Sequence, residues 1–139
     1  MKKNFEQIST KPGFMKHNGG LFFKSISENE YQFKTKISEN HLNAAGITHG
    51  GFLSAIVDAG AGTAAHRAAD NRPCVTISLE LKFISAARLG QELIGTTKIQ
   101  KKTKSMVFLT CELTAENKIV ATASGVWKIL KLTGAGPGG

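Results

Sequence analysis

The sequence has few of the residues that build disulfide frameworks, metal sites or membrane spans. Its 139 residues include two cysteines, Cys74 and Cys111, which lie in apolar strand-like runs and not in the spacing of metal ligands. No apolar run approaches the roughly 20 residues of a membrane-spanning helix, and no apolar stretch follows the N-terminal lysines as in a secretory signal. We therefore expect two free, buried thiols, no metal, no membrane partner and a cytoplasmic protein.

Acidic and aromatic residues are also scarce. Ten Asp and Glu oppose 18 Lys and Arg, which gives a net charge of +8, and aromatics make up 7% of the chain. Such a surface attracts polyanions, either nucleic acid or phosphorylated small molecules. Because there are few aromatics to stack on bases and no helix-turn-helix or zinc-finger motif, a phosphate-bearing ligand is favoured and nucleic acid is not expected.

The apolar periodicity predicts a single α+β domain over residues 1–133, followed by a flexible Gly-rich tail at 134–139. Every second residue from Val75 to Phe83 is apolar, which predicts a strand over residues 74–83 with Thr76 on the opposite, polar face. The other expected elements are strands at 21–23, 31–35, 92–100, 105–114 and 119–130, a loop at 36–50 and a helix at 51–69. Two strands, one helix and a further run of strands favour an antiparallel sheet with the helix on one face.

Asp58 is the only acidic residue in the expected helix. The helix is apolar nearly all round, so we expect it to be buried, and a buried carboxylate is costly unless it is paired or used. Its neighbours three, four and seven positions away are all small, which lets a substrate, a strand or a second subunit approach. A purely structural Asp bonded to backbone is an equally good interpretation. His66 and Arg67, farther along, are interpreted as a polar helix end that faces solvent.

Three candidates for ligand binding precede the helix: Asn43, His49 and Gly50. The first N–H groups of a helix have no intrahelical partner, so they can stabilise a developing negative charge such as a thioester oxyanion. A tight turn before a helix would explain the glycines about as well, and Asn43 and His49 could simply satisfy local backbone groups.

Taken together, these residues resemble the hot-dog thioesterases. The pattern His-x-Asn-x-x-Gly-x-x-His-Gly-Gly, from His41 to Gly51, is followed nine residues after its second His by Asp58. It is similar to the phenylacetate-degradation (PaaI-like) and thioesterase-superfamily-member-2 group, and the similarity continues through residues 75–90. The resemblance implies a curved antiparallel sheet wrapped around one long helix. It also implies hydrolysis of an acyl-coenzyme A with no cofactor beyond the substrate's own coenzyme A, and a homo-oligomer, a dimer of dimers, with active sites at the dimer interface.

The resemblance also assigns roles by position. Gly50 supplies the backbone oxyanion donor, and Asn43 and His49 orient the thioester and the lytic water. Asp58 reaches across from the other subunit as base or nucleophile, and Thr76 supplies a hydroxyl. The segments 83–88 and 101–106 match stretches that contact coenzyme A in relatives, and their candidate residues are Phe83, Ser85, Arg88, Lys101, Lys102 and Lys104.

Two other functions remain as alternatives. A hot-dog dehydratase or hydratase typically uses a catalytic His with a helix Glu, or an Asp–His pair in another order, and neither arrangement is matched. A non-catalytic acyl-CoA sensor would need no carboxylate at position 58. The sequence does not identify the acyl group.

Overall fold

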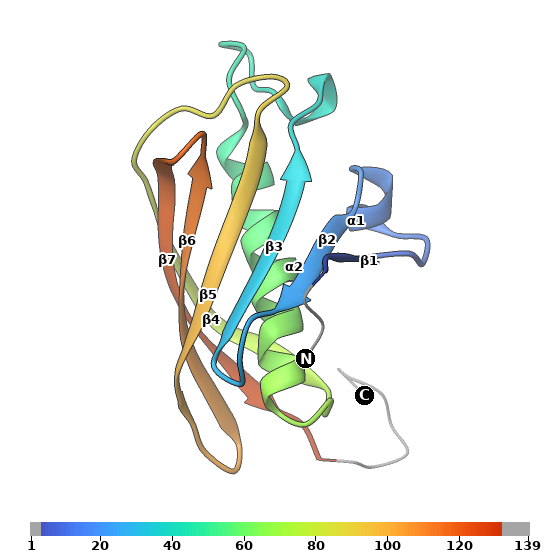
Figure 1. Cartoon of the computed structure of the whole chain (residues 1–139), viewed down its shortest axis with the longest axis vertical. Coiled ribbons are helices and arrows are strands. Elements are labelled where there is room, and N and C mark those ends of the chain that lie inside the picture. The colour runs from blue at the N-terminus through green and yellow to red at the C-terminus, as the bar shows by residue number, and fades with distance from the viewer. Residues whose placement is uncertain (1–3, 132–139) are drawn as a thin grey trace.

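A computed structural model describes residues 4–131, so the tail expected at 134–139 lies outside the described part. The described residues form an antiparallel sheet and one long helix, α2 (Gly50–Ala68), preceded by the single-turn helix α1 (Phe14–His17) and a 3-10 turn (Glu39–His41) (Figure 1). The strands are β1 (Glu6–Ile8), β2 (Leu21–Ser25), β3 (Glu30–Lys36), β4 (Cys74–Phe83), β5 (Glu92–Lys102), β6 (Met106–Ala115) and β7 (Lys118–Ile129).

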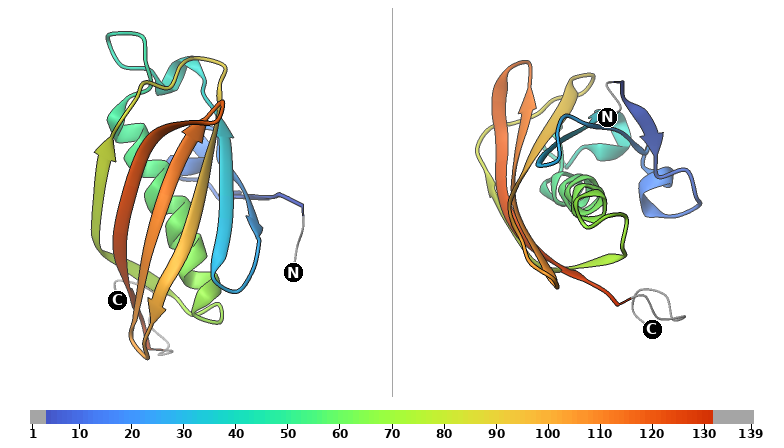
Figure 2. Two further views of the ribbon diagram at one scale, coloured as in Figure 1. Left: turned by 60° about the vertical axis from the view of Figure 1, so that its left-hand side comes forward. Right: turned by 60° about the horizontal axis from the view of Figure 1, so that its bottom comes forward.

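The sheet curves around α2. Its strand order is β1-β2-β3-β5-β6-β7-β4, and every neighbouring pair is antiparallel. Figure 2 shows the helix almost end-on, lying in the hollow of the sheet. The apolar side chains of the hollow and the inner face of the helix form one core, whose largest fully buried members include Trp127, Phe23, Phe33, Leu93, Leu109 and Leu113. The expected α+β architecture, a curved antiparallel sheet around one long helix, is confirmed.

Two glycines let α2 lie close to the sheet. Phe33 is fully buried on β3, and a Cβ placed at either Gly60 of α2 or Gly95 of β5 would overlap its ring. The ring therefore occupies a notch that exists only because both positions lack a side chain.

The expectation that α2 is buried all round is wrong for the single chain. Gly51 and Asp58 are exposed, and Gly62 and Thr63 are partly exposed. The sheet ends at β4, so no further strand covers this side of the helix. The small-residue side of α2 is thus an open stripe with the carboxylate on it.

The alternation expected for β4 is also wrong in one respect. The strand has the predicted bounds, but Ile77 is an extra residue with no partner on β7: Thr76 pairs with Trp127, and Ser78 with Val126. Directly paired residues share a face, and such a bulge reverses the alternation. Thr76 therefore faces the helix together with Leu79, whereas strict alternation predicts opposite faces.

The remaining predictions differ from the structure mainly at element ends. The helix begins and ends one residue earlier than expected. The strands β2, β3 and β5 are one or two residues longer at one or both ends, and β6 and β7 are displaced by one residue. The short elements β1 and α1 were not predicted, and the expected loop at 36–50 contains the 3-10 turn and a bridge between Leu42 and Thr48.

The two cysteines are free but are not equally buried. Cys111 is 4% exposed, as expected, and burial raises the pKa of its thiol to about 11. Cys74 is only half-buried, although burial also raises its pKa. Among the described residues, no helix is both long and apolar enough to cross a bilayer.

Candidate active site

His49 is the N-cap of α2. Its Nδ1 accepts a hydrogen bond of 2.8 Å from the Gly51 N–H. A ring nitrogen that accepts carries no proton, so in the neutral ring the proton is on Nε2. The side chain is exposed, and its Nε2–H remains available as a donor.

Asn43 holds the preceding loop. Its Oδ1 accepts from the N–H groups of Ala45 and Ile47, at 2.9 and 3.2 Å. The NH₂ of the same amide bonds to no other described residue. Asn43 and His49 therefore each satisfy local backbone through one polar atom, and each keeps an unused donor on its other nitrogen.

His41, the first residue of the motif, anchors the loop before α2 through contacts of its ring. The buried ring stacks on Phe52, with 3.6 Å between the ring centroids. Its Nδ1 accepts from the Ser38 N–H at 3.0 Å, so its Nε2–H donates to the Asn18 carbonyl at 2.7 Å. His41 thus ties the helix start to the rest of the fold.

Gly50 is the first residue of α2, and its N–H has no intrahelical partner. The ring of Phe83 lies beside it, 3.4 Å from the position a Cβ would take. Together with Asn43 and His49, Gly50 makes this end of the helix a group of donors, and the helix dipole adds to their attraction for negative charge. This donor group contains no base.

The base candidate lies elsewhere on the helix. The Thr76 hydroxyl donates a hydrogen bond of 2.6 Å to Oδ1 of Asp58. The carboxylate is exposed, and its Oδ2 bonds to no other described residue. The reversal of alternation at Ile77 makes this contact possible, because it turns Thr76 toward α2. Asp58 is therefore oriented through one oxygen and free through the other.

Within one chain, the donors around Gly50 and the Asp58 carboxylate lie apart. Eight residues of helix separate Gly50 from Asp58, which is about 12 Å along the axis. A single thioester cannot contact both an oxyanion donor and a base at that separation. The chain carries two half-sites, a donor half at the start of α2 and a carboxylate half in its middle.

A groove of about 640 Å³ runs from the carboxylate half along the open side of α2. It passes between the helix and the start of β4, and its lining includes Asp58, Gly62, Thr63, His66, Thr76 and Trp127. The interpretation of His66 as solvent-facing is wrong, because it is half-buried and its Nδ1–H donates to the Arg72 carbonyl at 2.7 Å. Neither His66 nor Trp127 was singled out as a site residue from the sequence.

The coenzyme A candidates Phe83, Ser85 and Arg88 lie at the donor end of the helix. Thr48, just before α2, bonds to the Ala87 carbonyl through both its N–H and its hydroxyl. The Ser85 hydroxyl donates to the Ile119 carbonyl, so it holds the loop. Phe83 is 58% exposed, and the guanidinium of Arg88 bonds to no other described residue.

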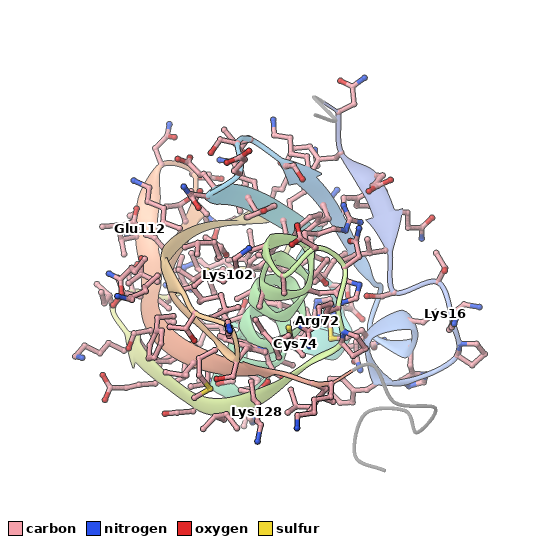
Figure 3. The ribbon with its side chains drawn as sticks, turned by 90° about the horizontal axis from the view of Figure 1, so that it is seen from below. Lys16, Arg72, Cys74, Lys102, Glu112 and Lys128 are labelled. Atoms are coloured by element: carbon pink, nitrogen blue, oxygen red, sulfur yellow. The ribbon has the colours of Figure 1, made fainter. Side chains whose placement is uncertain are left out.

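The candidates Lys101, Lys102 and Lys104 lie at the opposite end. Figure 3 shows Lys102 near the end of α2. Its Nζ donates to the Ala68 carbonyl at 3.0 Å and so caps the helix, and it lies 3.9 Å from the Asp70 carboxylate. Since α2 is about 28 Å long, one chain holds Arg88 and these lysines far apart.

A second groove, of about 1360 Å³, opens beside these lysines. Lys102 and Lys104 line it together with three cations that sequence reasoning missed: Arg72, Lys128 and Lys131. Asp70 is its one acidic lining residue. Arg72 and Lys128 are separated by 56 positions, so only the pairing of β4 with β7 reveals the cluster. In the described part of the chain, no three His, Cys, Asp or Glu side chains are grouped as a metal site would require.

The family of the chain follows from comparison with known proteins. Residues 45–122, more than half of the chain, match the model of the thioesterase superfamily. The chain belongs to the thioesterase superfamily. Membership of the thioesterase superfamily makes it a thioester hydrolase, and the matched segment contains Gly50, Asp58, Thr76 and the Arg88 loop.

Two relatives of this chain carry esterase or thioesterase names. A Pseudomonas aeruginosa protein named as an esterase is 34% identical over 80% of this chain and 84% of its own length. Human acyl-coenzyme A thioesterase 13 is 26% identical over 86% of this chain and 80% of its own.

Solved structures of the thioesterase superfamily confirm the hot-dog fold. Zebrafish thioesterase superfamily member 2 has a TM-score of 0.79 at 22% identity and covers 88% of this chain and 90% of its own. The Escherichia coli PaaI protein has a TM-score of 0.75 at 19% identity, with 84% and 83% covered. The predicted resemblance to this group is thereby confirmed.

Proposed function

We propose that the protein hydrolyses an acyl-coenzyme A thioester to a free acid and coenzyme A. The observation that carries the proposal is the pair of half-sites on one helix: a carboxylate oriented by Thr76, and N–H donors around Gly50. Asp58 activates water or attacks the carbonyl carbon itself, and the donors stabilise the oxyanion that forms. The name of the human relative, an acyl-coenzyme A thioesterase, supports this substrate class.

Two subunits are needed to complete the site. β4 is an edge strand of ten residues, and Ile77 and Phe83 on it are exposed apolar residues. When β4 pairs antiparallel with its own copy about a two-fold axis, the start of one β4 meets the end of the other. Thr76 and Asp58 of one subunit then approach Gly50 of the partner subunit, since Phe83 lies beside Gly50.

The same two-fold arrangement places the Arg88 loop of one subunit near the basic groove of the partner subunit. The Arg88 loop follows the end of β4, and the groove lined by Lys102, Lys104 and Arg72 lies beside its start. Two-fold pairing therefore brings Arg88 of one subunit toward the partner's lysine groove, where the cations can hold the phosphates of coenzyme A. A dimer is the smallest complete unit, and the dimer of dimers stays a prediction that sedimentation tests.

A thiol-release assay across short, long and aromatic acyl-CoAs tests the function. We expect Asp58→Asn to lower kcat about a hundredfold or more on the best substrate, the loss expected when a positioned base is removed. Glu112→Gln, which neutralises an exposed carboxylate on β6, is the matched control and should leave kcat unchanged.

Three other outcomes would contradict the proposal in different ways. Near-wild-type turnover by Asp58→Asn would contradict the catalytic role of Asp58. Binding of acyl-CoA without thiol release would indicate a sensor. A product that retains its thioester would indicate a dehydratase or hydratase.

A further inference from the structure

Trp127 is a buried side chain whose hydrogen-bond donor has no partner among the described residues. The side chain is 2% exposed, and its indole N–H donates to no other described residue. Buried tryptophans usually place this N–H on an acceptor, because an unmade bond costs more than a typical bond contributes. Among the described side chains, only Arg72 Nε and Thr97 Oγ1 are both sealed from solvent and unpaired, so the indole N–H opens to solvent and can bond a ligand that displaces the water.

The indole N–H edge lies on the groove that begins at Asp58. Trp127 lines this groove, and its Nε1 is 3.3 Å from the position a Cβ would take at Gly62. Gly62 lines the groove as well, and its missing side chain leaves the space in front of Nε1 open. A group lying over Gly62 would meet the donor.

The Asp58 carboxylate and the indole N–H of Trp127 are a short distance apart along α2. Gly62 is one helical turn beyond Asp58, about 6 Å along the axis. An acyl group whose carbonyl carbon lies at Asp58 and whose chain follows the open stripe of α2 reaches Nε1 within a few bonds. The acyl atom that lies next to Nε1 determines whether the indole N–H makes a hydrogen bond.

We propose that Trp127 is a specificity-determining residue that selects acyl groups carrying a hydrogen-bond-accepting oxygen about one helical turn from the thioester carbon. The inference rests on the proposed acyl-CoA hydrolysis and names its substrate class. A plain alkyl chain fills the same groove but leaves the N–H buried and unpaired, and sites built to bond an oxygen discriminate against analogues that lack it.

The test uses two thioesters that differ at one position. In 5-oxohexanoyl-CoA a carbonyl oxygen stands where 5-methylhexanoyl-CoA has a methyl group. The readout is the ratio of their kcat/KM values, because a general loss of folding or catalysis lowers both. We expect the wild type to favour the oxo substrate about fivefold or more, the effect of one neutral hydrogen bond.

Trp127→Phe keeps an aromatic ring and removes the donor, so the ratio should fall about fivefold or more. Gly62→Ala is the second variant: it leaves the indole in place and puts a methyl group in front of Nε1, and it should lower the ratio as well. An unchanged ratio in either folded variant overturns the proposal.

A binding measurement separates this proposal from the proposed function. Trp127 is the only tryptophan of the chain, so its fluorescence reports directly on the groove. If neither thioester is hydrolysed, acyl-CoA hydrolysis fails for these substrates. A fluorescence shift with the oxo compound that is absent with the methyl compound would still support the role of Trp127. Equal shifts, or none with either compound, would contradict it.

Discussion

The two carboxylate oxygens of Asp58 differ in their surroundings. Oδ1 of Asp58 is held by the Thr76 hydroxyl at 2.6 Å, and Oδ2 is free to accept a proton or to attack. A hydroxyl that donates to a carboxylate both orients it and stabilises its charged form. In the proposed mechanism Thr76 is a positioning residue, so its effect should depend on the hydroxyl and not on the bulk of the side chain.

Two substitutions of Thr76 separate those properties. Thr76→Val keeps the shape of the side chain and removes the donor, and we expect kcat to fall about tenfold, since a hydrogen bond to a charged group is lost. Thr76→Ser keeps the donor and should retain most of kcat. Steady-state kinetics on the best acyl-CoA gives both values. Equal losses in the two variants would show that packing of the Thr76 side chain against α2, and not the hydrogen bond, is what matters.

The sequence drew attention to Asp58 and Gly50, the proposed reacting residues, but not to their surroundings. Asp58 stood out because a lone carboxylate interrupts a small-residue helix, and Gly50 because it precedes the first turn. Trp127 gave no such signal, since an aromatic residue in an alternating strand is ordinary. Its importance depends on facing Gly62, 65 positions away, which only the packing of α2 on β7 establishes.

At the scale of elements, the contact between α2 and the sheet depends on the notch around Phe33. Gly60→Ala would add a methyl group that overlaps the ring. The gain in helix propensity, about 1 kcal/mol, is offset by overpacking that typically costs about 1–3 kcal/mol. We expect a net loss of unfolding free energy, measured by denaturant titration, and most of it should be recovered when Phe33→Leu shortens the ring side chain.

Gly62→Ala provides the control for that prediction. It makes the same change two residues along the helix, where the nearest atom is 3.3 Å from the new Cβ, so its cost should be smaller. A Gly60→Ala protein as stable as the parent would show that α2 can move away from the sheet without loss.

Elements with long periodic patterns were predicted closely. The bounds of β4 were correct, and α2 was displaced by one residue. β1 and α1, of three and four residues, are too short for periodicity to show. The extra residue in β4 could not be predicted, because Val75, Ile77 and Leu79 alternate perfectly in the sequence and the bulge arises from pairing with β7.

At the scale of the whole molecule, the two half-sites predict complementation between chains. Gly50→Pro removes the backbone donor at the first helical position, where proline is tolerated. Mixed with Asp58→Asn by co-expression, it should restore activity that neither variant has alone. About one quarter of wild-type activity is expected, because half of the dimers are mixed and each mixed dimer holds one intact site.

The matched control is Gly50→Ala, which adds a side chain beside Phe83 but keeps the N–H. It should remain active on its own. No recovery in folded, mixed dimers of Gly50→Pro and Asp58→Asn would contradict a site shared between subunits.

The extra residue at Ile77 reverses which side chains of β4 face the helix. Upstream of it the even-numbered side chains face the helix, and downstream the odd-numbered ones do. If Ile77 paired in register with Trp127 instead of bulging, the alternation set by Leu79 would continue and turn the Thr76 hydroxyl away from Asp58. The irregular pairing of this short stretch therefore matters to the proposed site as much as the chemistry of its side chains.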